Sequence, residues 1–355
     1  MRILAVTNMY PCAEFPASGV FIEQQVTGLR SIGVEARVLF ANRRVEGPMT
    51  YYRLGSRLRS MIAEFAPDLV HTMYGGVMAE QIARQPGLPP LVVTFHGSDL
   101  LGENLSGFWR KMISRYGVFC SRRAARRAQG VIVVARHLLR ALRGDINQSL
   151  VRVIPCGIDL ERFRPLDHRR CQERLGWAPG SMHVLFATSS GDPVKRPWLA
   201  RAAVDRVTAE GISAELHLLS GVANTDVPVW LNASDALLLT SQHEGSPTIV
   251  KEALACGLPV ISVEVGDVAE RIQGIEGCFL AEPEPADLAL KLRRVHQRRQ
   301  RLNSRERLEE LSCRSVAKRL EQFYRELVDT RCAAADLKSS MKHRLNQRSQ
   351  NMQRA

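Results

Sequence analysis

Short apolar runs alternate with helical stretches along almost all of this 355-residue chain, and this alternation constrains the fold more than any other feature. Nine runs have the length and residue types of buried β-strands: Ile3–Val6, Ala36–Phe40, Asp68–His71, Leu91–Thr94, Val131–Val134, Val184–Ala187, Glu215–Leu219, Ala236–Leu239 and Val260–Val263. Strands that alternate with helices form parallel sheets covered by helices. The pattern therefore predicts an α/β protein.

The length and a linker-like segment divide this pattern into two domains. At about 150 residues per domain, the chain suffices for two domains that each bury a core. A Pro- and Gly-containing segment, Ile154–Asp159, separates the first five runs from the last four. We predict an N-terminal domain over residues 1–160 and a C-terminal domain over residues 166–311. An amphipathic helix is expected over residues 312–329, and the polar, basic segment 330–355 is expected to be disordered.

Polar clusters follow predicted strands in both halves of the chain. In open parallel sheets, ligands bind beyond the carboxyl ends of the strands. In the first half, one cluster leads to Gly19 and another contains His96. In the second half, the clusters cover residues 188–195 and 240–244. A ligand bound between the two domains would reach all four clusters.

The segment His243–Gly257 has the pattern of a strand end, a tight polar turn and a short helix. Ser246 suits an N-cap and Pro247 suits the first helical position. Such a helix start favours phosphate, because its unpaired N–H groups and dipole point at the ligand. Glu244 and Glu252 flank this position, and carboxylates repel phosphate. We therefore expect them to accept hydrogen bonds from sugar or ribose hydroxyls of the same ligand.

Cysteine usage and hydropathy point to a cytoplasmic protein. The eight cysteines are scattered singly, without a Cys-x-x-Cys pair, which favours reduced thiols over disulfides or a zinc site. No apolar run approaches the roughly 20 residues needed to span a bilayer, and the N-terminus lacks the pattern of a signal peptide. We expect a cytoplasmic location, with peripheral binding at the inner face of the cell membrane.

Positive charge is concentrated in one segment. The net charge of +13 predicts an anionic partner, which is a nucleotide, a phospholipid surface or a nucleic acid. Residues 104–144 contain no acidic residue, and they contain ten basic ones: Arg110, Lys111, Arg115, Arg122, Arg123, Arg126, Arg127, Arg136, Arg140 and Arg143. A helix here would place Phe108, Met112, Tyr116 and Phe119 on one side. That side either packs on the sheet or binds an anionic membrane, and the single sign of charge favours the membrane.

The Glu-(seven residues)-Glu segment resembles the signature of retaining GT-B glycosyltransferases of family 4, the glycosyl transferases group 1. Ile154–Asp159 is similar to the linker of that family, with Cys156 in place of an asparagine, and the resemblance extends from Met1 to about Val328. It implies two Rossmann-like domains that face each other across a cleft. The implied reaction transfers a sugar from a UDP- or GDP-type nucleotide-diphosphate sugar to an acceptor hydroxyl, with retention of configuration. The implied setting is bacterial polysaccharide or glycolipid synthesis on a lipid-linked or saccharide acceptor.

The resemblance also implies roles for individual residues. His96 and Glu244 are expected to be catalytic at the donor sugar, and Glu252 is expected to bind the ribose. Lys195 matches the lysine that neutralises the diphosphate, and the family's arginine five positions earlier is Ser190 here. The remaining nucleotide-sugar-binding residues are expected to be Gly19, Arg196, Gly245, Ser246 and Thr248, with Arg196 partly replacing the missing arginine.

Neither a metal nor a cofactor is predicted. The chain has no Asp-x-Asp motif, which fits a class in which backbone dipoles and Lys or Arg side chains offset leaving-group charge. A Gly-x-Gly-x-x-Gly motif is also missing after the first strand, which argues against a dehydrogenase.

Three other functions stay open at this point. One is a nucleotide-sugar 2-epimerase of the same fold, which would consume the donor without an acceptor. Another is a glycosyltransferase-like protein that has lost activity along with the arginine at position 190. The third is a nucleic-acid-binding protein. Aromatic and basic residues interleaved on strands would support that reading, whereas the basic runs here fall on predicted helices and the tail.

Overall fold

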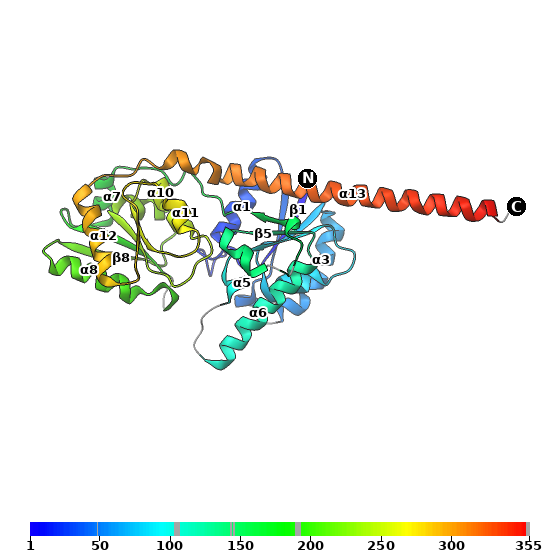
Figure 1. The fold of residues 1–355 in the computed structure, drawn as a ribbon, viewed down its shortest axis with the longest axis horizontal. Coiled ribbons are helices and arrows are strands. Elements are labelled where there is room, and N and C mark those ends of the chain that lie inside the picture. The colour runs from blue at the N-terminus through cyan, green and yellow to red at the C-terminus, as the bar shows by residue number, and fades with distance from the viewer. Residues whose placement is uncertain (48, 103–106, 143, 145, 189–192, 353–355) are drawn as a thin grey trace.

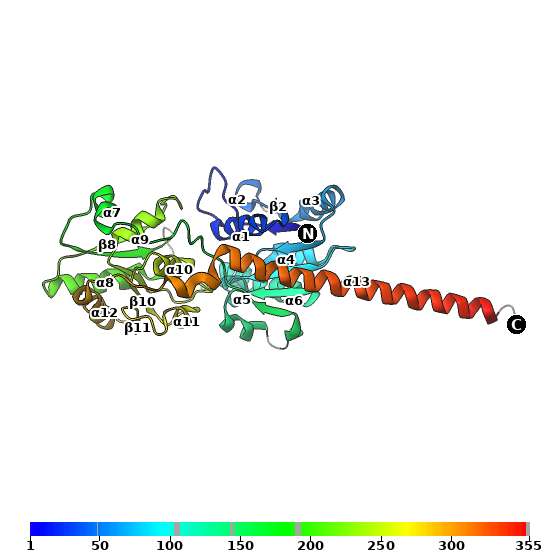
Figure 2. The ribbon, with the colours of Figure 1, turned by 90° about the horizontal axis from the view of Figure 1, so that it is seen from above.

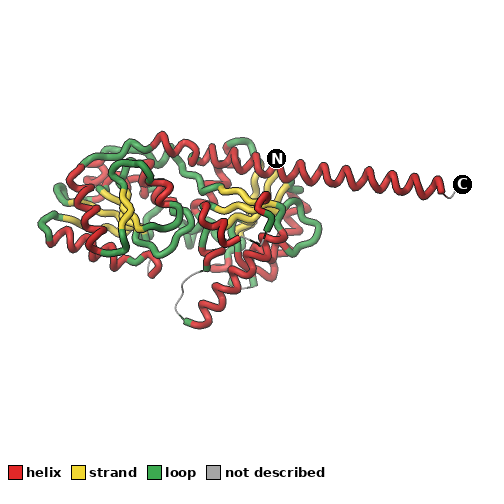
Figure 3. The backbone as a smooth tube through the Cα atoms, viewed as in Figure 1, coloured by secondary structure: helices red, strands yellow, loops and turns green. Residues whose placement is uncertain are grey.

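Two parallel β-sheets, one in each half of the chain, form the two domains of the protein (Figure 1). The computed structural model describes residues 1–47, 49–102, 107–142, 144, 146–188 and 193–352, with the backbone alone beyond residue 333. Figure 3 shows the two sheets as separate groups of strands, each surrounded by helices. The predicted α/β fold with two Rossmann-like domains is confirmed.

The N-terminal domain contains a six-stranded sheet in the order β2-β1-β3-β4-β5-β6. Its strands are β1 (Arg2–Thr7), β2 (Glu35–Phe40), β3 (Leu69–Thr72), β4 (Leu91–Phe95), β5 (Gly130–Val133) and β6 (Val151–Val153). Its α-helices are α1 (Val20–Ser31), α2 (Arg43–Glu46), α3 (Thr50–Phe65), α4 (Gly76–Ala83), α5 (Ser98–Leu101) and α6 (Phe108–Arg127). Two 3-10 helices, η1 (Arg136–Leu142) and η2 (Gln148–Leu150), precede β6.

The C-terminal domain contains a five-stranded sheet in the order β11-β10-β9-β7-β8. Its strands are β7 (Met182–Ala187), β8 (Ala214–Leu219), β9 (Ala236–Leu239), β10 (Val260–Val263) and β11 (Phe279–Ala281). Its α-helices are α7 (His168–Leu175), α8 (Pro197–Ala209), α9 (Val227–Ala233), α10 (Thr248–Ala255), α11 (Val268–Ile272) and α12 (Pro285–Arg298). The 3-10 helices are η3 (Pro193–Lys195) and η4 (Arg305–Leu311), and α13 (Cys313–Met352) follows.

All nine predicted runs are strands, and the sequence pattern missed two further strands, β6 and β11. Each missed strand has three residues, lies at the edge of its sheet and pairs with a single neighbour. The side chains of β6 are only partly buried. A short, half-covered edge strand lacks the continuous apolar run that marks a central strand of a parallel sheet.

Each sheet buries apolar side chains on both faces. Leu4 and Val6 of β1 enter one cluster, whereas Ile3 enters another on the opposite face, because successive side chains of a strand point to opposite sides. The C-terminal sheet is covered in the same way by two clusters of buried apolar residues. Separate cores allow each domain to hold its own strand ends rigidly.

Helix α13 crosses from the C-terminal domain back over the N-terminal domain (Figures 1 and 2). Val316, Leu320 and Phe323 are buried there with residues of the N-terminal sheet. Tyr324 is fully buried, and its hydroxyl lies 2.7 Å from Nδ1 of His71. The return helix therefore completes the core of the N-terminal domain.

The backbone of α13 stays helical to Met352, so over residues 330–352 the structure differs from the disorder predicted for residues 330–355; residues 353–355 lie outside the described part. The physical reason is the lack of any helix breaker, because no Pro or Gly occurs between Cys313 and Met352. Beyond the N-terminal domain, the helix projects as a single rod (Figures 1 and 2).

We predict that Tyr324→Phe destabilises the protein by about 1–3 kcal/mol in urea unfolding at pH 7, because it leaves a buried His71 nitrogen without its partner. Burial lowers the pKa of His71 to about 3, so this ring is neutral at pH 7. Tyr52→Phe is the matched control, since Tyr52 is 83% exposed. Equal effects of the two substitutions would contradict the buried hydrogen bond as the source of stability.

Candidate functional site

The loops that follow β4 and β9 touch each other between the two domains. A Cβ atom added to Gly245, after β9, would lie 1.7 Å from the carbonyl oxygen of His96, after β4. A Cβ on Gly97 would lie 3.1 Å from Cα of Gly245, and one on Gly266 would lie 2.8 Å from the carbonyl oxygen of Gly245. Three glycines therefore permit backbone contact at the carboxyl ends of both sheets, where ligands bind in this architecture.

His96 is held in one orientation by neighbours in the N-terminal domain. Its Nε2 lies 2.9 Å from the carbonyl oxygen of Met73, so Nε2 carries the proton and donates. Nδ1 faces the thiol of Cys156 at 3.7 Å, and the ring stacks on Tyr74. Burial lowers the pKa of His96 to about 4, so the imidazole is neutral at pH 7. Both ring nitrogens thus have protein partners, and the carbonyl oxygen of His96 lies against Gly245 of the C-terminal domain.

Asp99 holds the backbone beside His96 and does not bond to the imidazole. Its carboxylate accepts hydrogen bonds from the N–H groups of His96, Gly97 and Gly75, at 2.9–3.2 Å. Burial raises the pKa of Asp99 to about 6, although these hydrogen bonds act in the opposite direction. The structure shows it fixing the main chain that presents the His96 carbonyl.

Lys195 and Glu244 form an ion pair at the ends of β7 and β9. Nζ of Lys195 lies 2.5 Å from Oε1 of Glu244, and the two side chains are 24% and 15% exposed. The residue predicted to neutralise a diphosphate therefore contacts the residue predicted to bind a sugar. Ser190, at the position of the missing arginine, lies outside the described residues.

Arg196 supports the end of β9 through its guanidinium. Its Nε donates to the carbonyl oxygen of Thr240 at 2.6 Å and its Nη2 to that of Ser241 at 3.4 Å. Burial lowers its pKa. The hydroxyl of Thr240 donates in turn to the carbonyl oxygen of Lys195 at 2.7 Å. These bonds position Lys195 and its loop. The guanidinium of Arg196, which the sequence predicts to bind a donor phosphate, therefore binds backbone carbonyls of the protein here.

Helix α10 begins one residue later than the sequence predicts. Pro247 is the N-cap and Thr248 the first helical residue, so the prediction of Ser246 as cap is wrong. The Ser246 hydroxyl instead donates to Asp267 at 2.8 Å and accepts from Nζ of Lys251 at 3.2 Å. The competing carboxylate comes from another segment of the chain, and therefore a local capping rule did not reveal it.

Glu252 is buried in α10 with 8% of its surface exposed. Burial raises its pKa to about 7, and the positive charges of Lys251 and Arg162 oppose this shift. Hydrogen-bond donors stabilise the charged form of such a buried carboxyl group. Hydroxyl groups of a bound ligand are such donors.

Lys251 is a residue that the sequence pattern did not single out. Its side chain is fully buried, and Nζ donates to the carbonyl oxygen of Cys156 in the linker at 2.8 Å. Burial lowers the pKa of this amine. Lysine within a short helix normally indicates a solvated face, and only tertiary structure reveals that this one ties α10 to the linker.

Gly19 lies at the start of α1 with φ 71°. A Cβ atom there would lie 2.5 Å from the carbonyl oxygen of Met9, so the close packing of this turn alone requires glycine.

The structure thus brings Glu244, Lys195 and the start of α10 together beside His96, and it gives Gly19 a structural reason to be glycine.

Comparison with solved structures shows the class of fold. The chain is similar to sucrose-phosphate synthase from Thermosynechococcus elongatus, with a TM-score of 0.76, 16% identity and coverage of 93% of this chain and 100% of that one. It is also similar to Anabaena HepE in complex with UDP and glucose, with a TM-score of 0.66, 17% identity and coverage of 91% and 98%. The fold is that of the GT-B glycosyltransferases.

Sequence comparison gives the family. Residues 17–162 match Glycosyltransferase Family 4, and residues 182–298 match Glycosyl transferases group 1. The chain is 27% identical over 351 residues to the putative teichuronic acid biosynthesis glycosyltransferase TuaC of Bacillus subtilis, covering 81% of this chain and 86% of that protein. A D-inositol 3-phosphate glycosyltransferase of Geodermatophilus obscurus is 28% identical over 48% of this chain and 45% of its own length. The chain belongs to glycosyltransferase family 4, as its motifs predict.

Within the described part of the chain, no helix combines the length and the apolar character needed to cross a bilayer.

We predict that Gly245→Ala lowers kcat/KM for sugar transfer by about 100-fold or more, because a methyl group would push the strand ends of the two domains apart. Circular dichroism should show an unchanged fold, since each domain has its own core. Gly117→Ala is the matched control, because an added Cβ meets no atom within 4 Å there. Full activity of Gly245→Ala would show that the backbone contact is not needed for catalysis.

Proposed function

We propose that this protein transfers a sugar from a nucleotide-diphosphate sugar to an acceptor hydroxyl, with retention of configuration. The observation that carries the proposal is the convergence of Lys195, Glu244 and the start of α10 beside His96. The similarity to HepE, whose solved complexes contain UDP and glucose, supports a donor of this class. The name of TuaC supports a role in bacterial polysaccharide synthesis.

The ion pair between Lys195 and Glu244 suggests how the donor is received. The diphosphate competes with Glu244 for the ammonium group of Lys195, while the N–H groups at the start of α10 add further donors. A charge-assisted hydrogen bond of this kind contributes about 1.5–3 kcal/mol. When Lys195 turns to the phosphate, the Glu244 carboxylate becomes available to accept hydrogen bonds from the sugar. Glu252 accepts hydrogen bonds from the ribose.

The chemical step then needs no covalent enzyme nucleophile. The acceptor oxygen bonds to the anomeric carbon on the face from which the diphosphate departs, and a diphosphate oxygen takes the acceptor proton. Lys195 and the α10 dipole offset the charge on the leaving group, so we propose that neither a divalent metal nor another cofactor takes part. The carbonyl oxygen of His96, fixed by Asp99, faces the positive charge that develops on the sugar.

Two substitutions test these roles by separating donor binding from chemistry. Glu252→Gln is expected to raise the donor KM about 10- to 100-fold, because uncharged Gln forms weaker hydrogen bonds to the ribose. Glu244→Gln is expected to lower kcat on the order of 100-fold with a smaller change in KM. Assays in excess chelator test metal independence, and acceptor-free incubation reveals a 2-epimerase. Loss of donor binding with intact kcat in Glu244→Gln would refute its catalytic role.

The pH dependence offers an internal control for Glu252. Because burial raises the pKa of this carboxyl to about 7, the donor KM of the wild type should rise as the pH falls below 7 and the group becomes protonated. Glu252→Gln has no titrating group at this position and should lack that rise. An identical pH profile of the donor KM in both proteins would show that Glu252 does not bind the donor.

We further propose that α6 binds an anionic membrane and brings a lipid-linked acceptor to the N-terminal domain. The first half of α6 projects away from both sheets (Figures 1 and 3), and its large apolar side chains are exposed: Phe108, Trp109, Met112, Ile113, Tyr116 and Phe119. These side chains do not pack on the sheet, which was the other interpretation of the sequence. Burial of α6 begins with Cys120 and Ser121.

Fewer cations support this docking than the ten counted in the sequence. Arg123 and Arg127 bind Glu80 at 2.9 and 2.6 Å. Arg110, Lys111 and Arg115 are exposed on the same half of α6 as the apolar side chains. At roughly 1 kcal/mol each, these three contribute about 3 kcal/mol, in addition to apolar side chains that enter the interface.

Sedimentation with lipid vesicles tests the docking surface. The wild type should bind vesicles that contain anionic lipid, and binding should weaken with added salt. Trp109→Ala is expected to weaken binding by about tenfold, since an indole on the membrane side is lost. Trp198→Ala is the matched control, because Trp198 is 63% exposed on α8 of the other domain. Equal binding to neutral vesicles, or no binding to anionic vesicles at low salt, would refute the proposal.

A further inference from the structure

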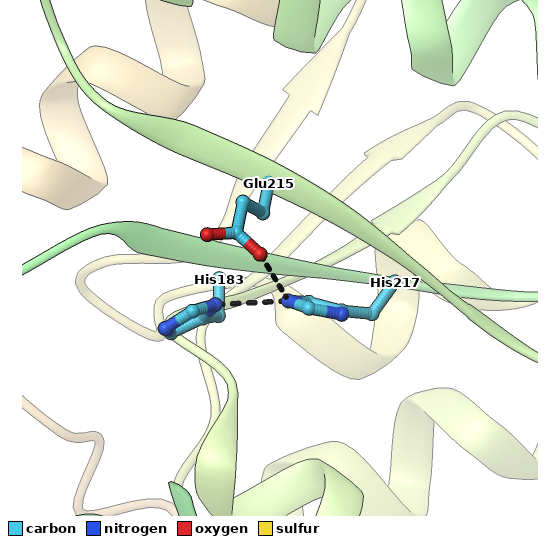
Figure 4. Close-up of side chains that lie close together, drawn as sticks. All are labelled: His183, Glu215 and His217. Atoms are coloured by element: carbon cyan, nitrogen blue, oxygen red, sulfur yellow. Dashed lines mark hydrogen bonds and ion pairs between the residues drawn. The ribbon is translucent and has the colours of Figure 1, made fainter. Parts of the chain in front are cut away.

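Three side chains that can ligate metal converge on one face of the C-terminal sheet, on β7 and β8 (Figure 4). In the parallel pairing, His183 lies opposite Glu215 and Leu185 lies opposite His217. Side chains two residues apart in a strand share a face, so the pairing itself brings the three together. Nδ1 of His183 lies 2.8 Å from Nε2 of His217, and Oε2 of Glu215 lies 3.8 Å from the same Nε2.

The hydrogen bonds of His183 direct a lone pair into this cluster. Its Nε2 lies 3.0 Å from the carbonyl oxygen of Ala178, which can only accept, so Nε2 carries the proton. Nδ1 is therefore unprotonated and faces His217 and Glu215. Metal-bound histidines characteristically donate their second N–H to a carbonyl in this way.

We propose that His183, Glu215 and His217 bind a divalent transition-metal ion of the zinc class. A set of two imidazoles and a carboxylate binds Zn²⁺ in preference to hard cations such as Mg²⁺. Ligand atoms about 2.0–2.1 Å from a tetrahedral ion lie about 3.3 Å apart, and the observed separations of 2.8 and 3.8 Å lie on either side of this value. Glu215 is exposed and His183 is fully buried, so an ion would enter from the Glu215 side and take water as a fourth ligand.

The surroundings make the cluster rigid. The indole of Trp177 stacks on the His217 ring with centroids 3.6 Å apart and planes 9° apart, and Trp230 packs edge-on against Trp177. Rigid packing around ligands lowers the cost of forming a metal site. An ion here would join the edge strand β8 to β7.

This site is separate from the one proposed for sugar transfer. His183 lies near the start of β7, whereas Lys195 follows the end of that strand. The ion would therefore stabilise the domain and would not enter the reaction. Sequence spacing predicts no metal, because 31 residues separate His183 from Glu215 and only sheet pairing unites them.

The stacked indole provides a direct readout. Chelator-treated, tag-free protein is titrated with Co²⁺ or Ni²⁺, and we expect saturable quenching of Trp177 fluorescence together with the visible absorption bands of a bound ion. Zn²⁺ should compete for the site and raise Tm in a saturable manner, and Mg²⁺ should do neither. Trp177→Phe should lose most of the quenching while still showing the Zn²⁺ shift in Tm.

Variants of the ligands distinguish a metal site from a network of packed side chains. Glu215→Gln, at an exposed position, should lower the affinity for the metal ion by about tenfold or more, because changes to outer-sphere residues alone lower metal affinity by that much. His217→Ala should abolish the Zn²⁺ shift in Tm. His296→Ala, on α12, is the matched histidine control and should behave as the wild type. Absence of quenching and of a Tm shift in the wild type, or an unchanged Zn²⁺ response in Glu215→Gln, would refute the site.

Discussion

The contact between the backbone of Gly245 and the carbonyl of His96 is the constraint on which the proposed site depends. The two domains have separate sheets and separate cores, so contacts between their loops set how the strand ends of one sheet face those of the other. A side chain at position 245 would occupy the place of the His96 carbonyl. Lys251 adds a second tie, because its buried ammonium group bonds to the linker carbonyl of Cys156. Helix α13 adds the third by completing the N-terminal core.

Buried charge at Glu252 and Lys251, together with the Lys195–Glu244 ion pair, supports the proposal of a polar, anionic ligand. Lys195 and Glu244 satisfy each other in a partly exposed pair, whereas burial raises the pKa of Glu252 and lowers that of Lys251. Groups whose ionisation is disfavoured by burial gain from a ligand that supplies hydrogen bonds and opposite charge. A diphosphate with a sugar at one end and a ribose at the other supplies both. In the proposed function, structural stability and donor recognition therefore draw on the same few side chains.

Much of the fold was predictable from the sequence, because central parallel strands are continuous apolar runs such as Val260–Val263. The Glu244–Glu252 segment was predictable because its turn and helix are local. The edge strand β6 was not, since it is short and half-covered. The N-cap of α10 was misplaced and Lys251 was missed, because Asp267 and Cys156, their partners, lie far away in the chain. His183 and His217 came together only through strand pairing.

Binding of nucleotide sugars to the isolated protein tests the central claim most directly. A thermal-shift series with UDP- and GDP-sugars, the free nucleosides and inorganic diphosphate requires neither an acceptor nor turnover. One nucleotide-diphosphate sugar should raise Tm saturably, equivalent to about 2.7 kcal/mol at 100 times its Kd, and Lys195→Ala should reduce the shift. The corresponding nucleoside alone should give only a small shift in Tm. No shift with any nucleotide-diphosphate sugar, or an undiminished shift in Lys195→Ala, would contradict a donor site at Lys195 and α10.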